Sequence, residues 1–164
     1  MRSETMGERS IGDATRTAVA MLTTAEQFVL GVCRCWDTFM EDPDPTLPWR
    51  ELWPVFAYMD VLSALCAFER TFSALHRHQH RHRHRPRTLQ FQEVDSPSVG
   101  TDEARMLCSL ACLQRGHARA TIRVLAESLA RCDIRAILPP MARIATILDM
   151  HGHRLPSWHH AVER

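Results

Sequence analysis

The sequence contains no lysine, so arginine carries all 20 of its permanent positive charges. Nineteen acidic residues leave a formal net charge of only +1. A chain so close to neutral lacks the basic excess that is typical of nucleic-acid-binding domains and of proteins that bind membrane surfaces. Because arginine codons are GC-rich, the missing lysine indicates a high-GC bacterial genome rather than a function.

The sequence also lacks a long apolar run. Its longest nearly apolar stretch, residues 54–68, is interrupted by Asp60 and is shorter than the roughly 20 residues that a transmembrane helix needs. Residues 1–16 mix acids with arginines and are followed by no apolar block, so we expect no secretory signal. We expect a protein of the reducing cytoplasm that keeps six free thiols, at Cys33, Cys35, Cys66, Cys108, Cys112 and Cys132.

The length of 164 residues suits one compact domain, and 45% apolar residues are enough for a hydrophobic core. Disordered chains combine low hydrophobicity with high net charge, and this chain has neither property. Its first twelve residues show no hydrophobic periodicity. We therefore expect a disordered tail over residues 1–12 and a single helical domain over residues 13–164.

Apolar residues recur at helical spacing over most of the chain. The pair Thr23 and Glu26 predicts a capping box before a helix over residues 24–41, which the prolines of residues 41–48 end. Strand signals are almost absent, apart from a short alternation near residues 89–94. We expect an all-α bundle of five to six helices. One further helix is predicted to begin near residue 46, with a break or a new start at Pro54. Four others are predicted over residues 58–76, 101–115, 117–132 and 133–152, the last with a kink at Pro139–Pro140. Their apolar stripes predict one shared core of Leu65, Phe68, Phe72, Leu107, Leu110, Ile122, Leu125, Met141 and Ile144.

Two segments resemble known helical proteins. Residues 113–129, LQRGHARATIRVLAESL, resemble the second half of a tetratricopeptide-type hairpin, in which a glycine turn, here Gly116, is followed four residues later by a small alanine, here Ala120. This resemblance implies a tight helical hairpin. The order of the segments TTAEQFVLGVCRCW, TDEARMLCSLACLQRGHARA and HGHRLP is similar to that of small uncharacterised all-helical proteins of alphaproteobacteria, a resemblance that brings no known activity with it.

Charge is distributed unevenly along the chain. Residues 1–75 carry a net charge of −5, residues 76–92 carry +5, residues 93–103 carry −4 and residues 104–164 carry +5. Two halves of opposite sign are thus joined by a basic tract. This pattern favours either packing of one half on the other or a polar partner surface.

Histidine and arginine nearly alternate over residues 76–87, which we predict to be part of a long exposed loop over residues 76–100. An extended backbone would place all five histidines on one side, whereas a helix would align positions 76, 80 and 84. Neighbouring arginines favour neutral imidazole, the form that binds metal, and the ligand type favours Zn, Ni or Cu. Low-complexity drift and a basic arm for anionic partners are the alternatives. The candidate metal ligands are His76, His78, His80, His82 and His84.

Cys108 and Cys112 are four residues apart and therefore share one face of a predicted helix. Such a pair is half of a zinc or haem-type site, but the sequence offers no second half at ligand spacing, so we expect both thiols to pack in the core. Arg115, Arg119 and Arg123 form a basic stripe on the next helix. We expect this stripe to be a solvated face or to pair with the acidic first half.

Aromatic residues gather around the proline-rich segment, where they form either the core of a bundle or an anchor for a ligand or partner. They are Trp36, Trp49, Trp53, Phe56 and Tyr58.

No catalytic or nucleotide-binding motif is present, neither a P-loop nor G-x-G-x-x-G, G-x-S-x-G or H-E-x-x-H. This favours a protein that is not an enzyme and that requires no cofactor. By elimination, the sequence predicts a cytoplasmic helical protein that binds a protein partner, forms a homo-oligomer or acts as a small regulator, without nucleic acid or membrane. The alternative is binding or buffering of Zn or Ni by the His-rich segment.

Overall fold

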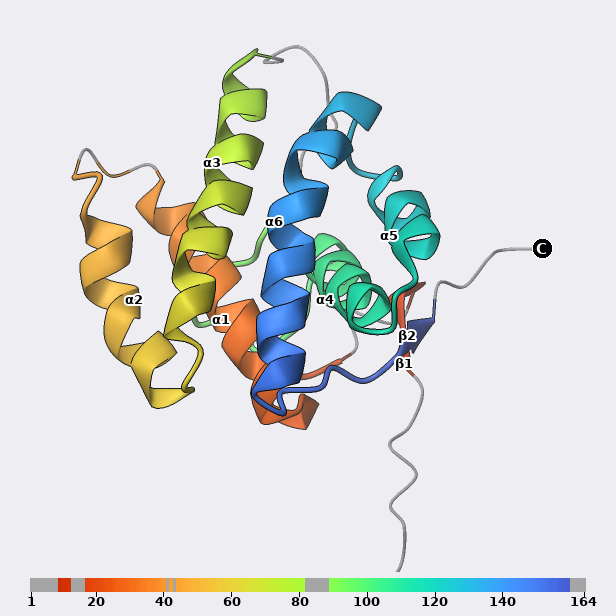
Figure 1. Cartoon of the computed structure of the whole chain (residues 1–164), viewed down its shortest axis with the longest axis horizontal. Helices are drawn as coiled ribbons and strands as arrows, with labels where there is room; N and C mark the ends of the chain where they lie inside the picture. The colour runs from red at the N-terminus through yellow and green to blue at the C-terminus, as the bar shows by residue number, and fades with distance from the viewer. Residues whose placement is uncertain (1–8, 13–16, 41, 43, 82–88, 160–164) are drawn as a thin grey trace, which may run out of the picture.

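A computed structural model describes residues 9–12, 17–40, 42, 44–81 and 89–159 of the chain. Within these residues the architecture is helical, as predicted, with six α-helices and one pair of very short strands. Figure 1 shows α3 and α6 at the centre of the bundle, α2 at one edge and α5 near the opposite edge. The elements are β1 (Arg9–Ser10), η2 (Val19–Met21), α1 (Thr24–Phe39), α2 (Leu47–Tyr58), η3 (Leu62–Ala64), α3 (Leu65–Arg81), α4 (Thr101–Gln114), α5 (Ala118–Leu125), α6 (Arg131–Met150) and β2 (Trp158–His159).

Helix α1 begins at the predicted capping box. The Thr23 hydroxyl oxygen accepts a hydrogen bond from the Glu26 backbone N–H at 3.3 Å, and the Glu26 carboxylate accepts one from the Thr23 N–H at 2.8 Å. These two bonds satisfy two N–H groups that would otherwise lack a partner at the helix start. The sequence prediction at this position is confirmed.

The prolines inside the helices do not end them. Helix α2 continues through Pro54, and α6 continues through Pro139 and Pro140. The predicted break at Pro54 is therefore wrong. Each proline removes one N–H donor, and the surrounding hydrogen bonds and the buried side of the helix keep the remaining turns in place.

The exposed loop predicted over residues 76–100 is wrong at both of its ends. Helix α3 continues past the last apolar residue of its stripe, Leu75, as far as Arg81. A helix needs no apolar side chain to continue, and the sequence contains no proline between Leu75 and Pro86 that would stop it. At the other end of the segment, Leu89 and Val99 are both buried. Residues 82–88 lie outside the described residues.

Helices α4 and α5 form the expected tight hairpin. Gly116 lies between them with φ +75°, a left-handed conformation that glycine adopts without a steric penalty. Helix α5 ends at Leu125, so it is shorter than the helix predicted over residues 117–132. Helix α6 then begins at Arg131. The hairpin places α5 on the outside of α4.

The first described residues belong to the fold rather than to the tail predicted over residues 1–12. Arg9 and Ser10 pair in parallel with Trp158 and His159, and the Ile11 side chain is buried. A strand of two residues is too short to produce a periodic pattern, so no sequence signal marks it. Residues 1–8 lie outside the described residues.

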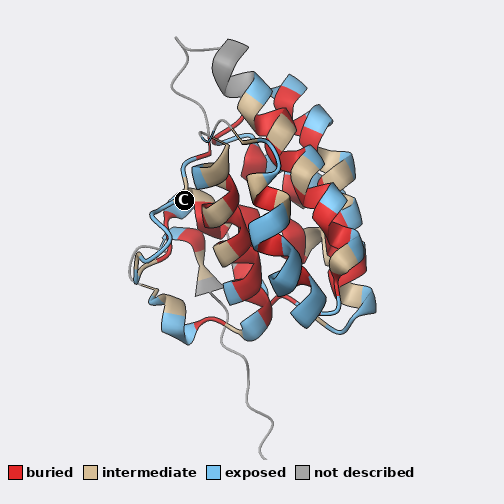
Figure 2. Cartoon of the chain, turned by 90° about the vertical axis from the view of Figure 1, so that its left-hand side faces the viewer, coloured by how far each residue is buried: buried red, intermediate tan, exposed pale blue. Residues whose placement is uncertain are grey.

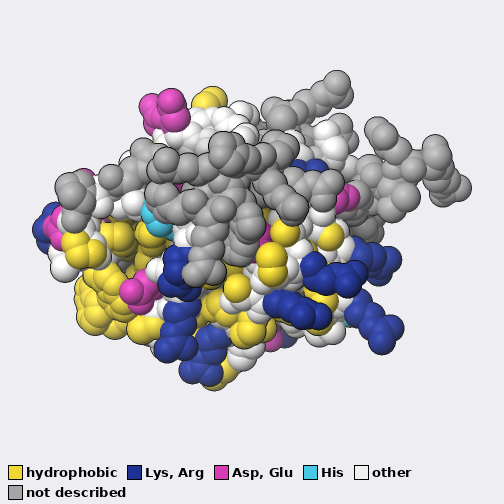
Figure 3. Space-filling view, turned by 90° about the horizontal axis from the view of Figure 1, so that it is seen from above, with side chains coloured by type: hydrophobic (Ala, Val, Ile, Leu, Met, Phe, Trp, Pro, Cys, Tyr) yellow, Lys and Arg dark blue, Asp and Glu magenta, His cyan; other side chains and the backbone are white. Residues whose placement is uncertain are grey.

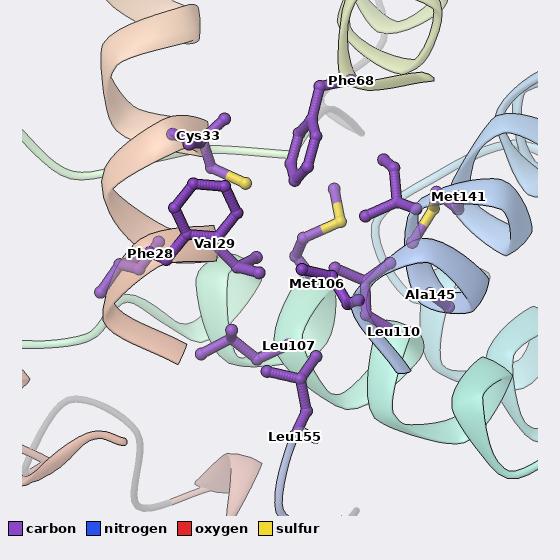
Figure 4. Close-up of a cluster of buried hydrophobic side chains, with 14 of the residues drawn as sticks. Phe28, Val29, Cys33, Phe68, Met106, Leu107, Leu110, Met141, Ala145 and Leu155 are labelled. Atoms are coloured by element: carbon purple, nitrogen blue, oxygen red, sulfur yellow. The ribbon is translucent and has the colours of Figure 1, made fainter. Parts of the chain in front are cut away.

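The core lies between α1, α3, α4 and α6. Figure 4 shows apolar side chains from these helices converging on one another, among them Phe28 of α1, Phe68 of α3, Leu107 of α4 and Met141 of α6. Of the nine predicted core residues, eight are buried; Ile122 is the exception, with 40% of its surface exposed. Figure 2, which views the bundle from the α2 side, shows exposed positions facing outward and buried positions between the helices.

Among the described residues, no helix combines the length and the apolar character that crossing a membrane requires.

Candidate interaction surfaces

A buried ion pair holds α1 against α4. The Arg34 guanidinium donates to both carboxylate oxygens of Glu103, at 2.8 and 2.9 Å, and both side chains are almost fully buried. Arg34 also donates to the carbonyl oxygens of Ser96 and Ser98, both at 2.7 Å. Glu103 in turn accepts the Gly100 N–H at 2.7 Å. These buried polar groups are thus satisfied by one another, and the network fixes α1 against α4 and the segment before it.

A second buried carboxylate, that of Glu26, binds the segment that follows α6. Glu26 accepts a hydrogen bond from the indole N–H of Trp158 at 2.8 Å, in addition to its bonds at the capping box. The Cys108 thiol donates to the Trp158 carbonyl oxygen at 3.2 Å. Trp158 therefore joins α1 to α4, which positions the segment after α6 across the base of the bundle.

Cys108 and Cys112 form a thiol pair on α4. Interaction with the neighbouring Cys108 thiol, together with the nearby Arg115, lowers the pKa of Cys112 to about 7. The interaction with Cys112, together with burial, raises the pKa of Cys108. The predicted core placement is right for Cys108, which is buried, whereas Cys112 is only half-buried. Cys112 is thus the more nucleophilic thiol of the two at neutral pH.

The His-rich segment is described only in part. His76 is half-buried on α3, and positions 78 and 80 belong to the same helix by their backbone. His82 and His84 lie outside the described residues. Within the described part of the chain, no three His, Cys, Asp or Glu side chains are close enough together to hold a metal ion.

The predicted aromatic cluster divides between the core and the surface. Trp36 and Phe56 are buried, and Trp36 stacks on Phe72. Trp53 and Tyr58 instead lie on the outer side of α2, with 50% and 88% of their surfaces exposed. We call this outer side the α2 surface; it consists of Trp53, Pro54, Val55, Ala57 and Tyr58, all of which are exposed.

Exposed aromatic side chains of this size are unusual on one helix, because burying them elsewhere would be favourable. No charged residue lies among the five, although Arg50 and Glu51 lie just before them on the same helix. Figure 3 shows a broad hydrophobic area on the side of the molecule that α2 forms. Tryptophan and tyrosine are enriched at protein-binding surfaces, so the α2 surface is a candidate interaction surface.

Arginine side chains gather elsewhere on the molecule. Figure 3 shows them over the side that α3, α6 and α5 form. Within the residues that the structure describes, none of these arginines makes an ion pair, so their charges are open to solvent or to a partner. They are Arg70 and Arg77 on α3, Arg119 and Arg123 on α5, and Arg131, Arg135 and Arg143 on α6, and all seven are exposed.

Helix α5 combines two of these arginines with apolar residues. Ala118, Arg119, Ile122 and Arg123 are exposed together, and we call them the α5 surface. Ile122 is there because the buried side of α5 is formed by Thr121, Val124 and Leu125. The Thr121 hydroxyl donates to the Ser109 carbonyl oxygen of α4 at 3.2 Å, which makes burial of this polar side chain favourable.

Comparison of the chain with protein-family models, with curated proteins and with solved structures gives no match.

Proposed function

We propose that this chain is a non-enzymatic interaction protein of the bacterial cytoplasm, which binds a protein partner through the α2 surface. The observation that carries the proposal is the exposure of Trp53 and Tyr58 on one side of a short helix. Large aromatic side chains that remain exposed in a well-packed bundle are typical of binding surfaces. We place the chain in a reducing compartment because a chain with 45% apolar residues needs no disulfides to stabilise its fold.

Site-specific photocrosslinking tests this function. A photoreactive phenylalanine analogue is introduced at position 58 in the native organism, and the full chain is purified under denaturing conditions. We expect a discrete adduct of higher mass that disappears when Trp53 is also replaced by Asp, because the exposed indole is part of the same surface. Thr146, an exposed residue of α6, is the control position and should give no such adduct. Equal or absent crosslinking at positions 58 and 146 would contradict the proposal.

Metal binding by the His-rich segment is the second candidate function, and it rests on one specific observation. Because α3 continues to Arg81, positions 76 and 80 lie one helical turn apart, the spacing at which two imidazoles can share one divalent ion. Zn and Ni are the ions whose ligand preference fits imidazole.

Titration of metal-free protein with Zn or Ni tests this second function. We expect micromolar affinity that falls at least tenfold when His76, His78, His80, His82 and His84 are all replaced by Asn, and that falls again as acid protonates imidazole. The control is the parent chain with Cys108 and Cys112 replaced by Ala, which should bind as the parent does. Unchanged binding by the histidine variant would show that the ligands lie elsewhere.

A further inference from the structure

The α2 surface and the α5 surface are complementary in charge as well as in apolar character. Asp44, Glu51 and Asp60 flank the α2 surface, and all three carry substantially exposed side chains. Arg50 bonds to the first two and offsets one of the three charges, and the His151 imidazole lies 3.3 Å from Asp60. The surroundings of α2 are therefore acidic, whereas the α5 surface carries two arginines beside Ile122.

The two surfaces do not contact each other within one molecule. Figure 1 places α2 at one edge of the bundle and α5 near the opposite edge, with α3 and α6 between them. Within the described residues, Arg119 and Arg123 form no ion pair, so the positive charge of α5 is not neutralised by the acidic half of its own chain. The acids beside α2 and the arginines of α5 thus lie on opposite sides of the bundle.

We propose that the occupant of the α2 surface is the α5 surface of a second copy of this chain. The inference rests on the proposed function, because it names the partner that the α2 surface binds. In this arrangement Trp53 and Tyr58 of one copy pack on Ile122 of the next, and the acids beside α2 face Arg119 and Arg123. Complementary charge at the rim sets the orientation, while burial of the aromatic side chains supplies the affinity.

The contact joins two different surfaces, so each copy retains one free α2 surface or one free α5 surface after a dimer forms. Such heterologous contacts lead to rings or to open chains rather than to a closed dimer. One helix on one helix buries less than the roughly 1,200 Å² in total that a stable interface needs. The association is consequently weak, dependent on concentration, and weakened by salt because its rim is ionic.

Sedimentation velocity of the full chain at rising concentrations, up to about 500 µM, is the first measurement. We expect average mass to increase with concentration at low salt, and the increase to shrink severalfold in 0.5 M NaCl. Two variants follow. Tyr58→Arg disrupts the α2 surface, and Arg119→Glu with Arg123→Glu disrupts the α5 surface. Each variant alone should associate at least tenfold more weakly than the parent chain, with an unchanged melting temperature because all three side chains are exposed.

Mixing the two variants gives the decisive measurement. The Tyr58→Arg chain keeps its α5 surface, and the chain with Arg119→Glu and Arg123→Glu keeps its α2 surface. The mixture should therefore form a dimer and nothing larger. The control is Arg70→Glu with Arg143→Glu, which changes net charge equally on exposed residues of α3 and α6 and should associate like the parent.

Each remaining outcome overturns the inference in a recognisable way. Self-association of the chain with Arg119→Glu and Arg123→Glu alone would indicate contact between two α2 surfaces instead. If the parent chain stays monomeric at every concentration, the proposed self-association is wrong. If that monomer instead binds single-stranded nucleic acid, nucleic acid is the partner of Arg119 and Arg123. If the monomeric chain still gives a Trp53-dependent adduct from position 58 with another protein, the proposed function stands and only the second copy is excluded.

Discussion

Replacing Glu103 by Ala is expected to lower the free energy of unfolding by about 3–5 kcal/mol, because it leaves the buried Arg34 guanidinium without its carboxylate. The two side chains are at most 2% exposed and are joined by two hydrogen bonds of 2.8 and 2.9 Å. The substitution also removes the acceptor for the N–H groups of Gln92 and Gly100. Chemical denaturation monitored by circular dichroism measures the loss.

The matched control is Glu51→Ala. Glu51 also pairs with an arginine, Arg50, at 3.1 Å, but about half of each side chain or more is exposed. Exposed pairs contribute about 0–1 kcal/mol, so this variant should unfold almost like the parent. A loss below about 1 kcal/mol for Glu103→Ala as well would show that the buried pair is not important for stability.

Leu125→Ala is expected to cost about 2–5 kcal/mol, the range for truncating a buried leucine that leaves a cavity. Leu125 has no exposed surface, although it lies at the end of the short helix α5. The free energy of unfolding from denaturant titration is again the measurement. A protein with a typical stability of about 5–15 kcal/mol would lose a large part of it.

Ile122→Ala on the same helix provides the comparison. Because Ile122 is 40% exposed, its truncation should cost less than about 1 kcal/mol. The two variants remove similar apolar side chains three residues apart, so the difference between them reports which side of α5 is packed. Equal costs would contradict the orientation of α5 in this structure.

The features that could be predicted from the sequence are those that depend on residues close together in the chain. The capping box joins Thr23 to a residue three positions away, and the apolar stripes of α1, α3, α4 and α6 each repeat within one helix, so the fold class and most of the core followed from pattern. The Arg34–Glu103 pair could not be predicted, because 69 positions separate its members. Nothing in the local sequence of either residue distinguishes it from a surface charge.

The errors at α5 and α3 have a similar origin. On α5, the apolar pattern favoured burial of Ile122, but the polar Thr121 is buried instead, because its hydroxyl donates a hydrogen bond to the carbonyl oxygen of Ser109. On α3, the apolar stripe ends at Leu75, but hydrogen bonding of the backbone continues the helix to Arg81. The exposed α2 surface was one of two open interpretations of the aromatic cluster, since periodicity alone does not show which helix lacks a neighbour.

The parallel pairing of β1 with β2 has a consequence for the synthesis of the chain. Arg9 and Ser10 leave the ribosome long before their partners Trp158 and His159, which lie 149 positions downstream (158 − 9 and 159 − 10). Glu26 similarly receives the Trp158 indole N–H from 132 positions downstream. At typical rates of translation this delay is on the order of 10 s. During that time the helices can form while β1 still lacks β2 and Glu26 still lacks the Trp158 indole, so the nascent bundle closes only after the segment that follows α6 has emerged.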